Sequence, residues 1–166
     1  MILSLVTSIY EAAIVKSRTT GVLEPRLFVL MDEAANIAPV RGLATWLSQC
    51  GDHGIVIATI WQSIAQIDQR YGRPARDAIC AASTAQLFIP PLADPTTTGY
   101  LAGLVGEEPV ASAQQGSGRR SLSASREQAA PAPWQRQVPR GHAILIYRDL
   151  PATVVRAPAW HQLPGS

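Results

Sequence analysis

Residues Leu27–Glu33 read Leu-Phe-Val-Leu-Met-Asp-Glu, an apolar run that ends in two acids. Near-continuous apolar residues of this kind are typical of a strand that is covered on both faces of a parallel sheet. The run therefore predicts a strand that delivers Asp32 and Glu33 to its carboxyl end. Any central strand can run into an acidic turn, so this stretch alone is compatible with a structural as well as a functional role.

Strand-like and helix-like segments alternate from the N-terminus onward. The expected helices cover residues 1–18, 41–49, 61–71, 74–82 and 96–105, and the expected strands cover residues 26–31, 54–60 and 86–89. Helices between strands imply crossover connections, and these favour an α/β fold with a mainly parallel sheet. The first helix has one apolar face and frequent polar residues, which indicates packing on a core rather than a membrane span.

The character of the sequence changes after the last of these helices. Residues 109–139 are rich in Ala, Ser, Gln, Pro and Arg and contain few large apolar residues, so a flexible loop is expected there. Residues 142–147 and 153–156 again look like strands joined by a turn. Residues 140–166 are thus expected to close, as strands and a tail, the domain whose first portion is 1–108.

The composition limits the class of protein. With 166 residues, 47% of them hydrophobic and 16% charged, the chain can build one domain with a core and is too apolar for general disorder. A formal net charge of +2 permits nucleic-acid binding without arguing for it. Cys50 and Cys80 lie far apart with no paired-cysteine motif, so reduced thiols are expected.

Asp32, Glu33 and Gln62 are the side chains best placed for chemistry. Gln62 follows the 54–60 strand, so it is expected at the tip of the strand adjacent to the one that carries the acids. Phosphoryl transfer needs one carboxylate to orient Mg²⁺ and a second group to position or deprotonate the attacking water, and these tasks suit Asp32 and Glu33. Gln62 could then report a bound γ-phosphate by hydrogen bonding.

Two alternative roles stay open for these residues. Gln62 could be an ordinary polar residue at the start of a helix. Asp32 and Glu33 could form an acid/base pair in an unrelated hydrolase, although adjacent residues on a strand point to opposite faces, which disfavours joint action.

The candidate residues belong to two longer sequence motifs. Residues 30–39 read Leu-Met-Asp-Glu-Ala-Ala-Asn-Ile-Ala-Pro, and residues 59–67 read Thr-Ile-Trp-Gln-Ser-Ile-Ala-Gln-Ile. Together with residues 70–72 and 93–96, they resemble the TraG/TraD-type coupling proteins of type IV secretion, and the resemblance spans most of the chain.

This resemblance implies a RecA-like P-loop NTPase core that belongs to an inner-membrane hexamer and uses ATP with Mg²⁺ to pump DNA during conjugation. It implies a Walker B role for Asp32 and Glu33, with Asp32 on the metal, and a nucleotide-sensor role for Gln62. Relaxosome proteins and type IV secretion components would be the partners. The cytoplasmic face of the membrane would be the location of the full-length protein.

The chain departs from the family pattern in one respect that bears on activity. A phosphate loop requires Gly-x-x-x-x-Gly-Lys-[Ser/Thr], and the glycine-rich stretch 116–121 has the wrong spacing and no lysine. We therefore expect a partial fold, with the phosphate loop and membrane helices in a missing half upstream of Met1. The chain alone is expected neither to bind ATP tightly nor to hydrolyse it. The alternative is a non-catalytic remnant or docking module that binds a relaxosome or secretion component.

Two further expectations follow from a partial motor domain. An incomplete sheet exposes strand edges and apolar faces and favours association. The family also uses an arginine finger across a subunit interface, and Arg70, Arg73 and Arg76 are candidates by position.

Overall fold

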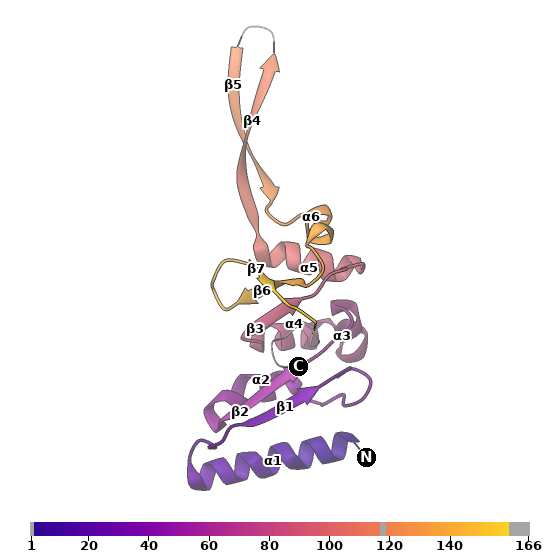
Figure 1. The fold of residues 1–166 in the computed structure, drawn as a ribbon, viewed down its shortest axis with the longest axis vertical. Coiled ribbons are helices and arrows are strands. Elements are labelled where there is room, and N and C mark those ends of the chain that lie inside the picture. Colours follow the sequence, from indigo (N-terminus) through magenta and orange to yellow (C-terminus); the bar gives the residue numbers. More distant parts are fainter. Residues whose placement is uncertain (1, 117–118, 160–166) are drawn as a thin grey trace. The chain divides into compact units, whose positions relative to one another are not determined.

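The computed structural model describes residues 2–116 and 119–159 and has an α/β fold (Figure 1). It divides into two compact units, Met1–Thr84 and Ala85–Ser166. The division falls inside the 1–108 segment that the sequence grouped together, because the strand Ala85–Phe88 pairs with a late strand and not with the first two. The expected tail at 160–166 lies outside the described residues.

The first unit contains a two-stranded parallel sheet. Its elements are α1 (Ile2–Thr20), β1 (Leu27–Met31), α2 (Leu43–Gln49), the 3-10 helix η1 (Cys50–His53), β2 (Ile55–Thr59), α3 (Ile64–Tyr71) and α4 (Arg73–Ala82). β1 and β2 run parallel, with Leu27 opposite Ile55 and Met31 opposite Thr59. The two apolar runs of the sequence are therefore neighbouring strands, as predicted.

One face of this sheet is covered by α1, which lies along the two strands in Figure 1. The buried core comprises Tyr10, Ala13, Leu23, Cys50 and Ile55, with Ile14, Leu27, Val29, Trp46 and Ile57 packed against it. The rings of Tyr10 and Trp46 stack with their centroids 3.9 Å apart, which ties α1 to α2. The prediction that the first helix packs on a core is confirmed. No helix within 2–116 or 119–159 is long and apolar enough to cross a membrane.

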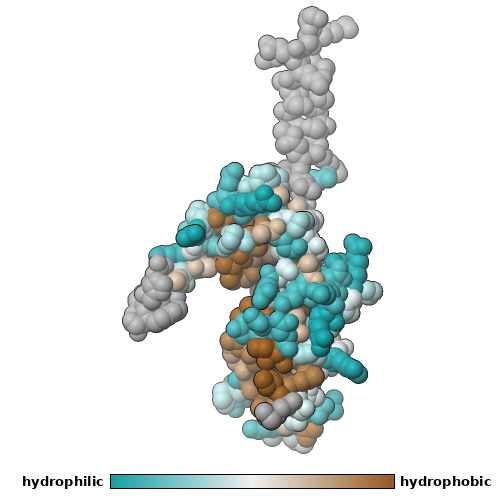
Figure 2. All heavy atoms as spheres, turned by 90° about the vertical axis from the view of Figure 1, so that its right-hand side faces the viewer, coloured by the Kyte–Doolittle hydropathy of each residue, from teal (hydrophilic) through white to brown (hydrophobic). Residues whose placement is uncertain are grey.

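The opposite face of the same sheet carries exposed apolar side chains. Side chains alternate along a strand, so Phe28, Leu30 and Val56 point away from α1, and they are 62%, 57% and 40% exposed. Figure 2 shows apolar side chains gathered on the surface of this unit. Among the described residues, this face therefore lacks the second covering layer that the near-continuous apolar runs predicted, and the expected exposure of apolar surface is confirmed.

A close backbone contact joins η1 to the segment that precedes β1. Gly54 has a φ of 73°, and a Cβ on it would lie 2.7 Å from the nitrogen and 2.8 Å from the oxygen of Leu23. The Leu23 amide donates to the His53 carbonyl at 3.2 Å, and the Leu27 amide donates to the Gly54 carbonyl at 3.0 Å. The Ser17 hydroxyl lies 2.7 Å from Nδ1 of His53. Only glycine fits this junction, because any side chain would meet backbone atoms.

The second unit contains an antiparallel sheet. Its elements are β3 (Ala85–Phe88), α5 (Pro95–Val105), β4 (Glu107–Gly116), β5 (Arg119–Gln128), α6 (Ala132–Gln137), β6 (His142–Tyr147) and β7 (Thr153–Arg156). The order in the sheet is β3-β6-β7, and both pairs are antiparallel. Within the described strands only β1 and β2 pair in parallel, so the expectation of a mainly parallel sheet is wrong for this part of the chain.

Burial of one apolar face accounts for this pairing. Phe88 of β3 lies directly opposite Ile144 of β6, and both join Leu101 and Val138 in one buried cluster. Antiparallel pairing in this register places the two side chains on the same face, against α5. A tight turn after β6 then returns β7 as the neighbouring strand, so the predicted closing hairpin is confirmed.

Asp94 begins α5. Its Oδ2 accepts hydrogen bonds from the Thr97 amide at 2.9 Å and the Thr97 hydroxyl at 2.7 Å, and its Oδ1 accepts from the Thr96 amide at 3.4 Å. Pro95 occupies the first turn of the helix, where a missing amide proton costs nothing. The 93–96 motif of the sequence is therefore a helix start in which Asp94 is the cap and Pro95 occupies the first turn.

β4 and β5 form a hairpin in which Glu107 lies opposite Gln128 and Gly116 lies opposite Arg119. The sequence predicted a loop across 109–139, and there the structure has two strands and α6 instead. Antiparallel pairing satisfies backbone donors and acceptors without a hydrophobic core, so a stretch poor in apolar residues can still form a ribbon. The flexibility of this segment stays a prediction.

Candidate functional site

The carboxyl ends of β1 and β2 meet at one edge of the sheet. The Ile60 amide donates to the Met31 carbonyl at 2.9 Å, and the Ala34 amide donates to the Ile60 carbonyl at 3.2 Å. These two backbone hydrogen bonds hold the turn after β1 against the segment after β2. They bring Glu33 and Gln62 together, as the sequence predicted from their places after adjacent strands.

The carboxylate of Glu33 lies between two side-chain amides. Nε2 of Gln62 donates to its Oε1 at 3.3 Å, and Nδ2 of Asn36 donates to its Oε2 at 3.3 Å. Each carboxylate oxygen thus has a neutral donor, which fixes its direction without adding charge. The motif alone predicts no role for Asn36, although this residue belongs to the same motif as Glu33 and stands three residues later in a tight turn.

The backbone of Glu33 is in the left-handed region, with a φ of 47°. This conformation costs a non-glycine residue about 1–2 kcal/mol. It lets the Glu33 carbonyl accept from the amides of Asn36 at 2.8 Å and Ile37 at 3.1 Å, and so closes the turn. Strain of this kind persists only where the surrounding structure fixes it, and it concentrates at functional sites.

Asp32 is the exposed member of the acidic pair. Its Oδ1 accepts from the Glu33 amide at 3.0 Å, which holds the carboxylate beside the turn. In the part of the chain that the structure describes, no group of three or more His, Cys, Asp or Glu side chains could hold a metal ion. Mg²⁺ in nucleotide sites takes only one or two carboxylates and fills its shell with water and substrate phosphates. The carboxylate oxygens of Asp32 and Glu33 fit that kind of site.

Gln62 is attached to α3 through its backbone. Its amide donates to Oε1 of Gln66 at 3.0 Å, and the Gln66 amide in turn donates to the Ser63 hydroxyl at 3.1 Å. Because Ser63 is the cap, α3 begins at Ile64 and not at the predicted residue 61. Any displacement of the first turn of α3 would therefore displace Gln62.

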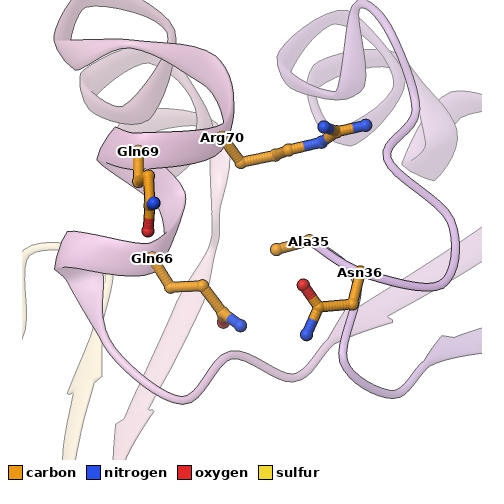
Figure 3. A pocket seen from close by; sticks show the side chains of 5 residues that line it. All are labelled: Ala35, Asn36, Gln66, Gln69 and Arg70. Atoms are coloured by element: carbon orange, nitrogen blue, oxygen red, sulfur yellow. The ribbon is translucent and has the colours of Figure 1, made fainter.

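A polar hollow of about 400 Å³ lies beside the turn after β1 (Figure 3). Ala35 and Asn36 of the turn line it on one side, and Gln66, Gln69 and Arg70 of α3 line it on the other. Figure 3 shows the amides of Asn36 and Gln66 facing each other, with the Arg70 side chain reaching from α3 toward the turn. The sequence did not predict this hollow. The sequence feature that indicates the hollow is the spacing of Gln66, Gln69 and Arg70, which puts the three side chains on one face of α3.

The three candidate arginines differ in their surroundings. Arg76 is buried and forms ion pairs with Asp77 at 2.7 Å and Asp68 at 3.4 Å. The hydrogen bond with Asp77 raises the pKa of the Arg76 guanidinium. Arg70 and Arg73 are exposed and form no ion pair with the side chains that the structure describes, those of residues 2–107 and 129–159. Arg76 is thus engaged within its own unit, and the identity of an arginine finger stays a prediction.

The fold and this edge of the sheet define a class: an α/β protein with an acidic turn after one strand that faces a glutamine after the parallel neighbour. A family model described as the TraM recognition site of TraD and TraG matches residues 26–137. The chain therefore belongs to the TraG/TraD family of coupling proteins and corresponds to their C-terminal part, as its motifs predicted. A comparison with curated proteins gives no match.

Solved structures of a bacterial conjugative coupling protein, TrwB, have the same fold. The unbound monoclinic form of TrwBdeltaN70 is 24% identical with a TM-score of 0.64, covering 79% of this chain and 31% of that one. TrwB in complex with the non-hydrolysable ATP analogue ADPNP is 21% identical with a TM-score of 0.68, covering 94% and 36%. TrwB with ADP and Mg²⁺ is 22% identical with a TM-score of 0.62, covering 80% and 30%. The chain spans about a third of the length of these proteins.

Proposed function

We propose that this chain is the C-terminal part of the RecA-like motor domain of a coupling ATPase that transfers DNA in conjugation. The observation that carries the proposal is the hydrogen bond between Gln62 and Glu33 at the carboxyl edge of the parallel pair. Ligands of open α/β sheets bind beyond this edge. Nucleotide complexes of TrwB, which has the same fold, support ATP and Mg²⁺ as the ligands.

Each of the three residues has a distinct task in this proposal. Asp32, exposed and held by the Glu33 amide, is available to orient Mg²⁺, which when bound neutralises developing charge on the phosphates. Glu33 orients the attacking water and accepts its proton once its carboxylate is released from an amide. Gln62 can exchange its bond to Glu33 for one to a phosphate oxygen, and α3 carries that change outward.

The rest of the motor is proposed to cover the bare face of the sheet. Phe28, Leu30 and Val56 form an apolar surface of the kind that a second layer covers in a doubly covered parallel sheet. A further segment of the same coupling protein, with the phosphate loop and membrane helices, would supply that layer and the phosphate cradle. The assembled protein would be a hexamer at the cytoplasmic face of the membrane, with DNA, relaxosome proteins and secretion components as partners.

Equilibrium binding of a fluorescent ATP analogue with Mg²⁺ tests this proposal. The titration is made for the chain alone, and for the chain mixed with a coupling-protein segment that carries the phosphate loop. Binding only in the mixture, weakened by Gln62→Ala and with turnover lost in Glu33→Gln, is the expected result. Glu11→Gln, an exposed acid on α1, is the matched control and should change neither. No binding in the mixture would refute the motor function.

A docking module is the second candidate. It is favoured by the description of the matching family model, which is a recognition site for TraM, a protein partner of TraD and TraG. In this case the chain binds a relaxosome or secretion component without catalysis. Titration of labelled chain with a TraM-type protein tests it, and saturable binding without any nucleotide binding in the mixture would favour this function over the motor.

A further inference from the structure

We propose that the hollow between the turn after β1 and α3 binds one phosphodiester group of a single-stranded nucleic acid, with Arg70 as its cationic contact. This inference rests on the proposed function, because it assigns the DNA contact to a place next to the nucleotide edge. It deepens that function by naming the residues that would couple the two ligands.

The chemistry of the lining favours a phosphate oxygen. Four of the five side chains are polar, and they comprise the amides of Asn36, Gln66 and Gln69 and the guanidinium of Arg70. No acid lines the hollow itself, and the neighbouring Glu33 carboxylate accepts a hydrogen bond from Asn36 in its wall. Arginine and side-chain amides are the usual donors to phosphate and sugar oxygens in nucleic-acid complexes.

The charge of the hollow matches a phosphodiester better than the triphosphate of a nucleotide. Arg70 is the one cation in its lining, and it forms no ion pair with the side chains described in 2–107 and 129–159, so its charge is available to a ligand. A phosphodiester carries one negative charge, whereas a triphosphate carries several and requires a lysine and a metal ion beside it. The shape agrees, because an open polar hollow suits a strand that passes over it.

The hollow shares hydrogen bonds with the candidate catalytic residues. Asn36 donates to Glu33, and Gln66 accepts from the Gln62 amide, so both walls of the hollow reach the edge of the sheet. A phosphate oxygen in the hollow would compete with Glu33 for the Asn36 amide. Strand binding would in this way release one oxygen of the Glu33 carboxylate, which would let DNA promote the step that needs a free carboxylate.

Fluorescence anisotropy with a labelled single-stranded oligothymidine tests the site in the 166-residue chain. We compare Arg70→Ala with Arg73→Ala, because Arg73 is also exposed but does not line the hollow. Arg70→Ala should weaken binding roughly fivefold or more and lower the slope of log K against log salt by about 0.7. Arg73→Ala should do neither, and Arg70→Lys should keep the slope because the charge remains.

Three results would overturn the site, and each is separable from failure of the motor function. The first is that the wild-type chain does not bind oligothymidine at low salt. The second is that Arg70→Ala and Arg73→Ala weaken oligothymidine binding equally. The third is that Arg70→Ala weakens only the binding of the ATP analogue in the mixture. The last would mean that the anion is a nucleotide phosphate. Circular dichroism of each variant checks that the fold is retained.

Discussion

The side-chain amide of Gln62 donates to the carboxylate of Glu33 at 3.3 Å across a separation of 29 residues. This single bond joins the turn after one strand to the start of the helix after the next. Neither residue is buried, so the bond contributes little to stability and its value lies in the direction it gives the Glu33 carboxylate. The geometry around Glu33 leads to the first prediction.

Replacement of Glu33 should reveal the strain in its left-handed backbone as a change in the free energy of unfolding. Glu33→Gly removes the left-handed strain, so the free energy of unfolding should be unchanged or higher by up to about 1 kcal/mol. Glu33→Val should lower it by about 1–2 kcal/mol, because a β-branched side chain fits this conformation poorly. Urea denaturation of the two variants and the parent measures the difference. A Glu33→Gly chain clearly less stable than the parent would mean that the side-chain bonds outweigh the strain.

Gly54 should be irreplaceable for packing reasons. Its φ of +73° is strained for alanine, and the added Cβ would meet the Leu23 backbone at 2.7 Å, so Gly54→Ala should cost about 3 kcal/mol or more. Gly42→Ala is the control, because Gly42 has a φ of +75° with nothing within 4 Å, and it should cost about 1–2 kcal/mol. Thermal and urea unfolding compare them. Equal costs would show that the Leu23 contact relaxes easily.

Alkaline pH should destabilise the first unit through Cys50. Burial raises the pKa of this thiol above its value in the unfolded chain, so the folded state holds the proton more tightly. The contribution to stability is complete below about pH 8.5, the usual thiol range, and is lost as pH rises toward the folded pKa. Urea unfolding in a reducing buffer at neutral and alkaline pH should give a falling free energy for the parent. Cys50→Ala should give a flatter profile, and an identical slope would contradict this assignment.

Asp94 should act as a helix cap rather than as a catalytic acid. Asp94→Ala removes an acceptor for the Thr96 and Thr97 amides and should cost about 1 kcal/mol, whereas Asp94→Ser should recover most of it. Neither change should affect binding of the ATP analogue in the mixture. A loss of nucleotide binding in the Asp94→Ser chain, with stability retained, would argue for a direct role in the site.

The parts of the fold that the sequence predicted are those set by local periodicity. β1 and β2 were visible as apolar runs, and helix α1 as a one-faced pattern, because a strand or helix of this length carries its own signal. The partner of β3 was not visible. A short apolar strand does not specify its direction, and its pairing with β6 depends on Phe88 and Ile144 meeting in a cluster 56 residues apart in sequence.

The same limit applies to the candidate site. Asp32, Glu33 and Gln62 follow strands, and adjacent strand tips meet at one edge, so their neighbourhood could be derived. The contact of Asn36 with Glu33 depends on a left-handed turn at a non-glycine residue, which no propensity predicts. The extended strands β4 and β5 were missed because composition reports the absence of a core, not the absence of backbone pairing.

The uncovered side of the β1–β2 sheet has a consequence for how preparations of this chain are judged. Dyes such as ANS fluoresce on exposed apolar surface, and that signal is commonly taken as a sign of a molten globule. Here Phe28, Leu30 and Val56 present such a surface in the folded state. A properly folded sample should therefore enhance ANS fluorescence while it keeps near-ultraviolet circular dichroism from the stacked Tyr10 and Trp46 rings.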